Sequence, residues 1–183
     1  MGLARELLSE AKLVDGAVYG AVAAAETPRL DRGMRALSRA ADHGKLWFGA
    51  ASALALLGGD RGRAAARRGL VSLGTASAIA NLVGKPLTTR RRPEREELEE
   101  LAARQVPMPR SSSFPSGHTA SAFGFAFGAG AAWPVLSPPL RALATLVGYS
   151  RVHTGVHYPA DVVAGAFLGV SAAELAGRLL DRG

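Results

Sequence analysis

The sequence contains no cysteine, and this absence excludes disulfide bonds, thiolate nucleophiles and cysteine-ligated metal centres. Aromatic residues make up only 6% of the 183 residues. Neither an aromatic stacking platform nor a zinc-ligand spacing is present, so we predict no nucleic-acid partner. Acidic residues are outnumbered, because 22 lysines and arginines stand against 15 acidic residues and give a formal net charge of +7. This excess of positive charge favours anionic lipid or a phosphate-bearing substrate as the partner.

Long uninterrupted hydrophobic runs are also missing, although hydrophobic residues make up 48% of the chain. The apolar residues gather in shorter segments separated by polar, arginine-rich stretches. These segments are residues 46–57, 69–84, 114–133, 140–149 and 159–180. The second segment is rich in small residues, which let helices pack closely in lipid, and Trp47 stands at an interface-like position in the first. We therefore predict an all-α, integral-membrane bundle of five or six transmembrane helices.

The first 43 residues differ from the rest, and we predict an N-terminal interfacial region ahead of a catalytic domain at residues 44–183. Residues 1–12 lack the apolar core of a cleavable signal and are predicted to form a short amphipathic helix. Residues 13–25 are apolar but short, since a bilayer crossing needs roughly 20 apolar residues. They form either a marginal first crossing or an interfacial helix. Residues 26–45 have apolar side chains at helical spacing, which predicts a helix lying in the membrane surface.

Three polar clusters interrupt the apolar segments, at residues 85–93, 114–118 and 150–161. The first cluster follows one apolar segment, the second begins the next, and a polar loop joins them, so both lie on one membrane face. The chain then crosses, turns at Pro138-Pro139 and crosses back to reach the third cluster. Counting crossings therefore places all three clusters on the same face.

These clusters contain cationic side chains and the predicted start of a helix. Lys85, Arg92 and Arg151 are positive charges whose convergence at a membrane edge is costly unless they meet an anion. Arginine is suited to bidentate contacts with phosphate oxygens. Ser116 and Gly117 stand where backbone N–H groups at a helix N-terminus bind anions. We predict that these five residues bind a phosphate group.

Two histidines and an aspartate complete the clusters. His157 and Asp161 are four residues apart, so on a helix they would share a face. A carboxylate that holds one ring nitrogen fixes the imidazole tautomer and leaves the other nitrogen free to attack. His118 comes from a different segment and can donate a proton to a leaving alkoxide. A nucleophile, an orienting carboxylate, a general acid and an anion clamp together indicate phosphoryl transfer.

The clusters resemble the three motifs of the type 2 phosphatidic acid phosphatase superfamily. That pattern is Lys, six residues, Arg-Pro; then Pro-Ser-Gly-His; then Ser-Arg, five residues, His, three residues, Asp. Residues 85–93, 115–118 and 150–161 match it at every defined position and in the same order. The resemblance covers roughly residues 44–180 and implies a helical bundle with a metal-independent phosphohistidine mechanism.

The resemblance implies a role for each matched residue. His157 would attack phosphorus, Asp161 would orient it, and His118 would protonate the leaving group. The five residues of the predicted anion site would bind the phosphate, with no cofactor and no metal ion. The same superfamily includes vanadium-dependent haloperoxidases, but the apolar segments and the small size of this chain argue against that branch.

Other polar residues receive simpler interpretations. His153 and His157 have the spacing of a helical metal pair, but no glutamate accompanies them, so His153 is interpreted as a local loop residue. His43 and Lys45 are interpreted as part of an interfacial anchor rather than an extension of the site. Arg90 is interpreted as attracting anionic headgroups.

The predicted function is hydrolysis of a phosphomonoester or pyrophosphate of a lipid in the cell membrane. The resemblance implies phosphatidic acid, phosphatidylglycerol phosphate, a polyprenyl pyrophosphate or a polyprenyl-phosphoryl sugar phosphate as substrate. The sequence assigns neither one of these lipids nor an oligomeric state. The alternatives are a lipid-phosphate binding or transport protein without turnover and a vanadate-dependent haloperoxidase.

Two further predictions concern the surface of the protein. The arginine-rich residues 60–68, together with Arg178 and Arg182, lie on the face opposite the clusters. The positive-inside rule therefore predicts an active site that opens to the extracytoplasmic side. Residues 94–104 are predicted to form a solvated surface helix with pairs of opposite charge four residues apart.

Overall fold

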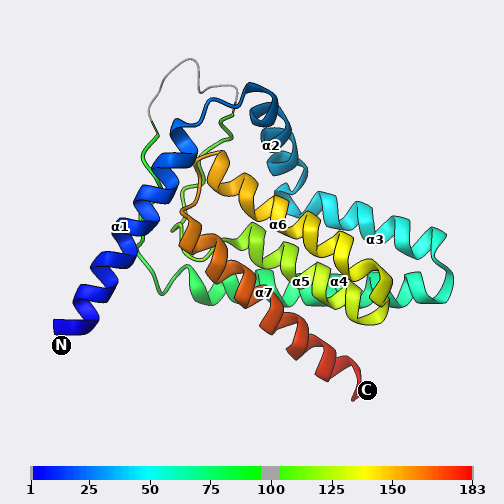
Figure 1. Ribbon diagram of the computed structural model, residues 1–183. Helices are drawn as coiled ribbons and strands as arrows, with labels where there is room; N and C mark the ends of the chain where they lie inside the picture. Colours follow the sequence, from blue (N-terminus) through cyan, green and yellow to red (C-terminus); the bar gives the residue numbers. More distant parts are fainter. Residues whose placement is uncertain (1, 96–103, 183) are drawn as a thin grey trace.

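The computed structural model describes residues 2–95 and 104–182, and within these ranges it consists of helices without β-strands (Figure 1). The α-helices are α1 (Gly2–Ala24), α2 (Pro28–Ala40), α3 (Lys45–Leu57), α4 (Gly59–Ala78), α5 (Gly117–Ala132), α6 (Ser137–His153) and α7 (Pro159–Leu180). Shorter helical segments are the 3-10 helices η1 (Asp42–Gly44) and η4 (Pro134–Leu136) and the π-helix η2 (Ile79–Gly84). The all-α prediction is confirmed, whereas the surface helix predicted for residues 94–104 lies mostly outside the described residues.

Helix α5 is the centre of the bundle, and α4, α6 and α7 pack around it. Its side chains Ala120, Phe125 and Ala129 are fully buried. Small residues permit close approach between helices: a Cβ added to Gly128 would lie 2.3 Å from Ser72 Oγ on α4. A larger residue at position 128 would therefore push α4 and α5 apart.

Trp47 belongs to this core, so its indole does not face a surrounding membrane interface. Its side chain is 1% exposed, and its ring centroid is 5.1 Å from that of Phe125. The interfacial prediction for Trp47 was wrong because α3 packs along α4, which turns the indole toward α5.

The end of α4, the start of α5, the end of α6 and the start of α7 meet at one end of the bundle, on the left in Figure 1. The Ser116 amide donates a hydrogen bond to the Asp161 carbonyl at 2.9 Å, which joins the starts of α5 and α7 directly. Ser116 is also the N-cap of α5, with its side chain accepting from the Thr119 amide. The helix start predicted at residues 116–117 is therefore confirmed.

Helix α1 runs without interruption from Gly2 to Ala24, so residues 1–12 and 13–25 are not separate elements. It lies against α6 and α7, while α2 packs on α6. The N-terminal region thus covers the end of the bundle at which the polar clusters gather (Figure 1).

Among the described residues, α7 is the one helix that is long and apolar enough to cross a bilayer by length and composition. Its large side chains Val163, Phe167 and Leu179 are exposed on the outside of the bundle. Helix α3 has 13 residues and rises about 20 Å, less than the roughly 30 Å of a hydrocarbon core. The number of crossings, five or six, stays a prediction.

Candidate active site

His157 lies in the connection between α6 and α7 and is 2% exposed. Its Nδ1 atom is 3.4 Å from Asp161 Oδ2, and its Nε2 atom is 3.2 Å from Arg92 Nη1. Because a guanidinium only donates, Nε2 is an acceptor and the ring proton belongs on Nδ1, toward Asp161. Burial lowers the pKa of His157 to about 4, against the opposing effect of Asp161. The ring is therefore neutral at pH 7, with its Nε2 lone pair directed toward the cationic cluster.

A helix cap, rather than a shared helical face, brings Asp161 to His157. His157 precedes α7, whose N-cap is Tyr158, so the two residues are not one turn apart on a helix as predicted. Instead, Asp161 accepts a hydrogen bond from the Tyr158 amide at 2.9 Å. This cap turns the chain at Tyr158 and places the imidazole beside the carboxylate.

Asp161 is fully buried, and Arg90 supplies a positive charge next to it. Arg90 Nη1 donates to Asp161 Oδ1 at 2.9 Å, and Arg90 also pairs with Asp15 of α1. The other oxygen of Asp15 accepts from the Ala160 amide at 2.8 Å. The interpretation of Arg90 as a headgroup attractor was wrong, because its guanidinium neutralises a buried carboxylate and ties α1 to the start of α7.

Arg92 is fixed in place by backbone carbonyls. It donates to the carbonyl oxygens of Val156 at 2.7 Å and Ser112 at 3.1 Å. Burial lowers the pKa of Arg92, and burial together with the charges of Arg92 and Arg151 lowers the pKa of Lys85. Partly buried cations that repel one another form a site that a phosphate dianion would stabilise.

His118, in the first turn of α5, is hydrogen-bonded to Asp42 of η1. Its Nε2 atom donates to Asp42 Oδ1 at 2.8 Å, and this hydrogen bond lowers the pKa of Asp42. Arg151 Nη1 lies 3.8 Å from the same carboxylate oxygen and donates to Ser38 of α2. The Nε–H of Arg151 is buried and makes no hydrogen bond with the described residues, so it is available to an incoming anion.

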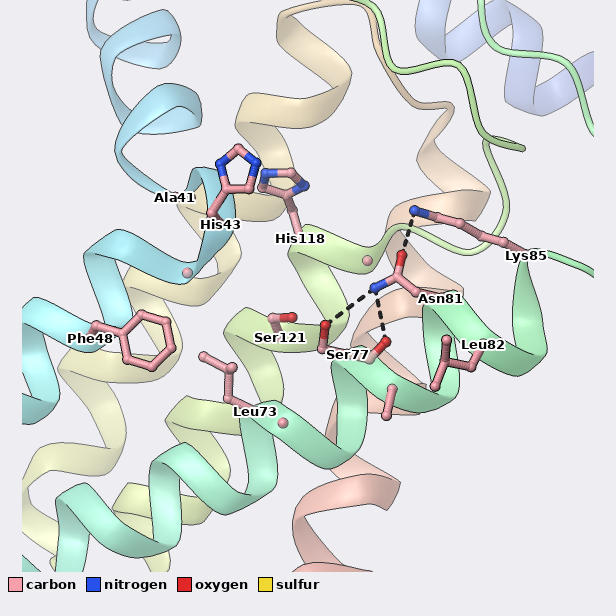
Figure 2. Close-up of a pocket in the computed structure, with 14 residues that line it drawn as sticks. Ala41, His43, Phe48, Leu73, Ser77, Asn81, Leu82, Lys85, His118 and Ser121 are labelled. Carbon is pink, nitrogen blue, oxygen red and sulfur yellow. Dashed lines mark hydrogen bonds between the residues drawn. The ribbon is translucent and has the colours of Figure 1, made fainter.

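Lys85 follows η2, and its Nζ atom donates to Asn81 Oδ1 at 2.7 Å (Figure 2). A Cβ added to Gly117 would lie 3.6 Å from Nζ, which places this cation beside the start of α5. Lys85, Gly117 and His118 line one cavity together with His43, so His43 borders the site.

The structure places all eight predicted site residues at one end of the bundle, in three sets of contacts. His157 contacts Arg92 and Asp161, Ser116 bonds Asp161, and Lys85 approaches Gly117. His118 and Arg151 both lie beside the carboxylate of Asp42, a residue that the sequence analysis did not identify. The supporting residues that sequence reasoning missed are Asp15, Ser38, Asp42 and Arg90.

His153 is not a loop residue, because it ends α6 and is 2% exposed. Its Nε2 atom contacts Asp31 Oδ1 of α2 at 2.8 Å, and Arg104 pairs with the same carboxylate at 3.1 Å. Arg104 also donates to carbonyls at the end of α1, including Ala23 at 3.0 Å. This buried cluster connects α1, α2 and α6.

Comparisons with known proteins agree with this arrangement. The family model of the PAP2 superfamily matches residues 66–181. Decaprenylphosphoryl-5-phosphoribose phosphatase of Mycolicibacterium smegmatis is 35% identical over 167 residues, which cover 86% of this chain and 84% of that protein.

Two solved structures share the fold. The transmembrane PAP2-type phosphatidylglycerolphosphate phosphatase of Bacillus subtilis superposes with a TM-score of 0.71 at 22% identity, covering 94% of this chain and 87% of that one. Aquifex aeolicus LpxE gives a TM-score of 0.70 at 22% identity, covering 88% of this chain and 93% of that one. The family model covers most of α4 and all of α5, α6 and α7, and all three motifs lie at one end of the bundle, so the chain belongs to the PAP2 superfamily.

Proposed function

We propose that the chain is a membrane lipid phosphatase that transfers a terminal phosphoryl group first to His157 and then to water, without a metal ion or a cofactor. The observation that carries this proposal is the position of the buried His157 ring between the Asp161 carboxylate and the Arg92 guanidinium. A neutral imidazole beside fixed cations suits attack on an anionic phosphate.

In the first step, the Nε2 lone pair of His157 forms a bond to phosphorus while the bond from phosphorus to the leaving oxygen breaks. The positive charge that develops on the ring is stabilised by Asp161 at Nδ1. Protonated His118 keeps Nε2 on Asp42 and gives the proton of Nδ1 to the leaving alkoxide. Lys85, Arg92 and the buried Arg151 neutralise the phosphoryl oxygens.

In the second step, water attacks the phosphohistidine from the side that the leaving group vacated. Neutral His118 takes a proton from this water, the bond from phosphorus to Nε2 breaks, and inorganic phosphate leaves. The enzyme returns to its starting protonation state, so the cycle balances without a metal-bound hydroxide.

For the substrate, we propose a polyprenyl-phosphoryl sugar that carries a terminal phosphomonoester, of the decaprenylphosphoryl-5-phosphoribose class. The support is the mycobacterial relative, which bears that substrate in its name and matches this chain over 84% of its own length. The two structural neighbours support the fold alone at their 22% identity.

We further propose that the chain crosses the cell membrane several times and that the site opens to the extracytoplasmic face. Arg68 of α4 pairs with Asp181 beyond α7 at 2.7 Å, at the end of α7 that lies away from the site. Arg61, Arg63, Arg67 and Arg68 stand in the first half of α4, and the positive-inside rule assigns the face that they mark to the cytoplasm.

Phosphate release from a panel of lipids in detergent, with EDTA present, tests the proposal. We expect release from decaprenylphosphoryl-5-phosphoribose to exceed release from phosphatidic acid and phosphatidylglycerol phosphate, because the relative acts on the former class. We expect EDTA to change the rate by less than about twofold, since His157 rather than a metal hydroxide attacks. Activity that EDTA abolishes and a divalent metal restores would contradict the mechanism.

Asp42 is a positioning residue for His118, and Asp42→Asn is expected to lower kcat on the lipid by about ten- to a hundredfold. The amide removes the charge that stabilises protonated His118, so the basic limb of the pH–rate profile should move to lower pH. The loss should nearly disappear with p-nitrophenyl phosphate, whose leaving group needs no proton. Asp60→Asn, on the exposed start of α4, is the matched control. Equal losses on both substrates would count against this role.

A further inference from the structure

A cavity of about 680 Å³ lies between α3, α4 and α5 and ends at the phosphate-binding residues (Figure 2). Lys85, Gly117 and His118 form its polar end. Phe48 of α3 and Leu73 of α4 stand on the apolar walls farther from Lys85. The cavity therefore offers a charged end and an apolar end to one elongated ligand.

The position of His118 identifies the part of the substrate that this cavity receives. Phosphoryl transfer proceeds in line, so the leaving oxygen lies opposite the attacking atom. Under the mechanism proposed above, His157 attacks and His118 protonates the leaving oxygen. Among the described residues, His118 lines the cavity and His157 does not. The cavity is thus on the leaving-group side of phosphorus.

Polar side chains line the cavity next to His118. Ser77, Asn81 and Lys85 follow one another at four-residue spacing, and Asn81 Nδ2 donates to Ser77 Oγ at 3.2 Å while its Oδ1 accepts from Lys85 (Figure 2). Ser121 stands one turn after His118 on α5. Its hydroxyl lines the cavity and makes no hydrogen bond with the described residues, so it can both donate to and accept from a ligand.

We infer that this cavity binds the sugar of the leaving group, with Ser121 and Ser77 hydrogen-bonding its ring hydroxyls and the polyprenyl chain lying along Phe48 and Leu73. Asn81, whose amide donates to the carbonyl and the hydroxyl of Ser77, holds Ser77 in place. The inference rests on the proposed function and adds the residues that select the substrate. A diacylglycerol leaving group has no hydroxyls to satisfy these side chains. A polyprenyl diphosphate would place its charged inner phosphoryl group, rather than a sugar, beside these serines.

Ser121→Ala tests the inference with the smallest change in volume. We expect kcat/KM on decaprenylphosphoryl-5-phosphoribose to fall about five- to tenfold, the effect of one lost hydrogen bond to substrate. On dioleoyl phosphatidic acid the change should stay below about twofold, because that lipid has no sugar hydroxyl. Ser171→Ala, on the exposed face of α7, is the matched control and should leave both values unchanged.

Substrate analogues that lack the 2- or the 3-hydroxyl of ribose complete the test on the unmodified protein. We expect one analogue to lose about five- to tenfold in kcat/KM with the wild-type enzyme and to lose nothing further with Ser121→Ala, because both changes remove the same bond. The inference would be overturned if Ser121→Ala and the missing hydroxyl gave additive losses in kcat/KM with both analogues. It would also be overturned if Ser121→Ala lowered kcat/KM equally on the sugar lipid and on phosphatidic acid.

Failure of the proposed function would look different. A wild-type enzyme that released no phosphate from any lipid in the panel would refute the phosphatase itself. A wild-type enzyme that turned over the phosphoribosyl lipid, with Ser121→Ala equally active on it, would refute only the sugar-binding role of the cavity.

Discussion

Replacing His157 with alanine is expected to lower lipid phosphatase activity by at least about 10⁴-fold, because the atom that forms the bond to phosphorus is gone. Arg92 and Lys85 would still attract the phosphate, so substrate binding should weaken much less than turnover. Single-turnover phosphate release and equilibrium binding of the lipid, measured on the same preparation, separate the two effects.

A second variant guards against loss of folding, since His157 is buried. His157→Gln keeps polar atoms of similar reach and should be as inactive as the alanine variant, with a thermal unfolding midpoint close to wild type. His153→Asn removes another buried histidine at the end of α6 and breaks its contact with Asp31. It should unfold at a lower temperature yet keep turnover within about threefold, because His153 contacts Asp31 rather than a residue of the proposed site. Residual activity in both His157 variants above about 10% would be incompatible with attack by this ring.

Asp161→Asn is expected to lower kcat by about 10²–10⁴-fold through the imidazole tautomer. The carboxylate lies 3.4 Å from His157 Nδ1 and favours a proton there, whereas an amide NH2 group facing Nδ1 would drive the proton to Nε2. The attacking lone pair would then be lost, and the same NH2 group would also replace the oxygen that caps the Tyr158 amide. ¹⁵N NMR of the histidine rings distinguishes the two tautomers and provides a readout that a purely structural role would not change.

The pH dependence of the Asp161→Asn variant follows from the direction in which the pKa of His157 is shifted. The wild-type ring has its pKa lowered to about 4 by burial, and Asp161 acts in the opposite direction. Removing the carboxylate would lower the pKa further, so the ring stays neutral from pH 5 to pH 8 in both proteins. The loss should therefore be constant across that range. Asp181→Asn, which breaks the exposed pair with Arg68, is the control. Recovery of Asp161→Asn activity with rising pH would contradict the tautomer account.

The spacing of the motifs predicted the eight site residues. The count of crossings predicted that these residues meet at one end of an all-α bundle. Both predictions were possible because each motif begins or ends a helix, and helix ends are fixed by local sequence. The N-cap at Ser116 is one example, since serine before a glycine-led helix satisfies a free backbone amide. The pairing of His157 with Asp161 was predicted, but through a helical face rather than through the cap at Tyr158.

The supporting carboxylates were not predictable in the same way. Asp15 and Asp42 come from α1 and η1, which lie ahead of the residues that the family model matches. Their contacts with Arg90 and His118 depend on how the N-terminal region docks on the bundle, which no local pattern specifies. One signal was present: a lone carboxylate at Asp15 within an apolar stretch requires a cationic partner, and Arg90 is that partner.

Detection of a covalent phosphohistidine tests the central claim most directly. The wild-type enzyme is mixed with ³²P-labelled lipid substrate, quenched within the first turnover and digested. We predict acid-labile, base-stable label on the peptide that contains His157, and no label in His157→Ala. Rapid turnover with no labelled peptide at any quench time, or label on a residue other than His157, would contradict the account.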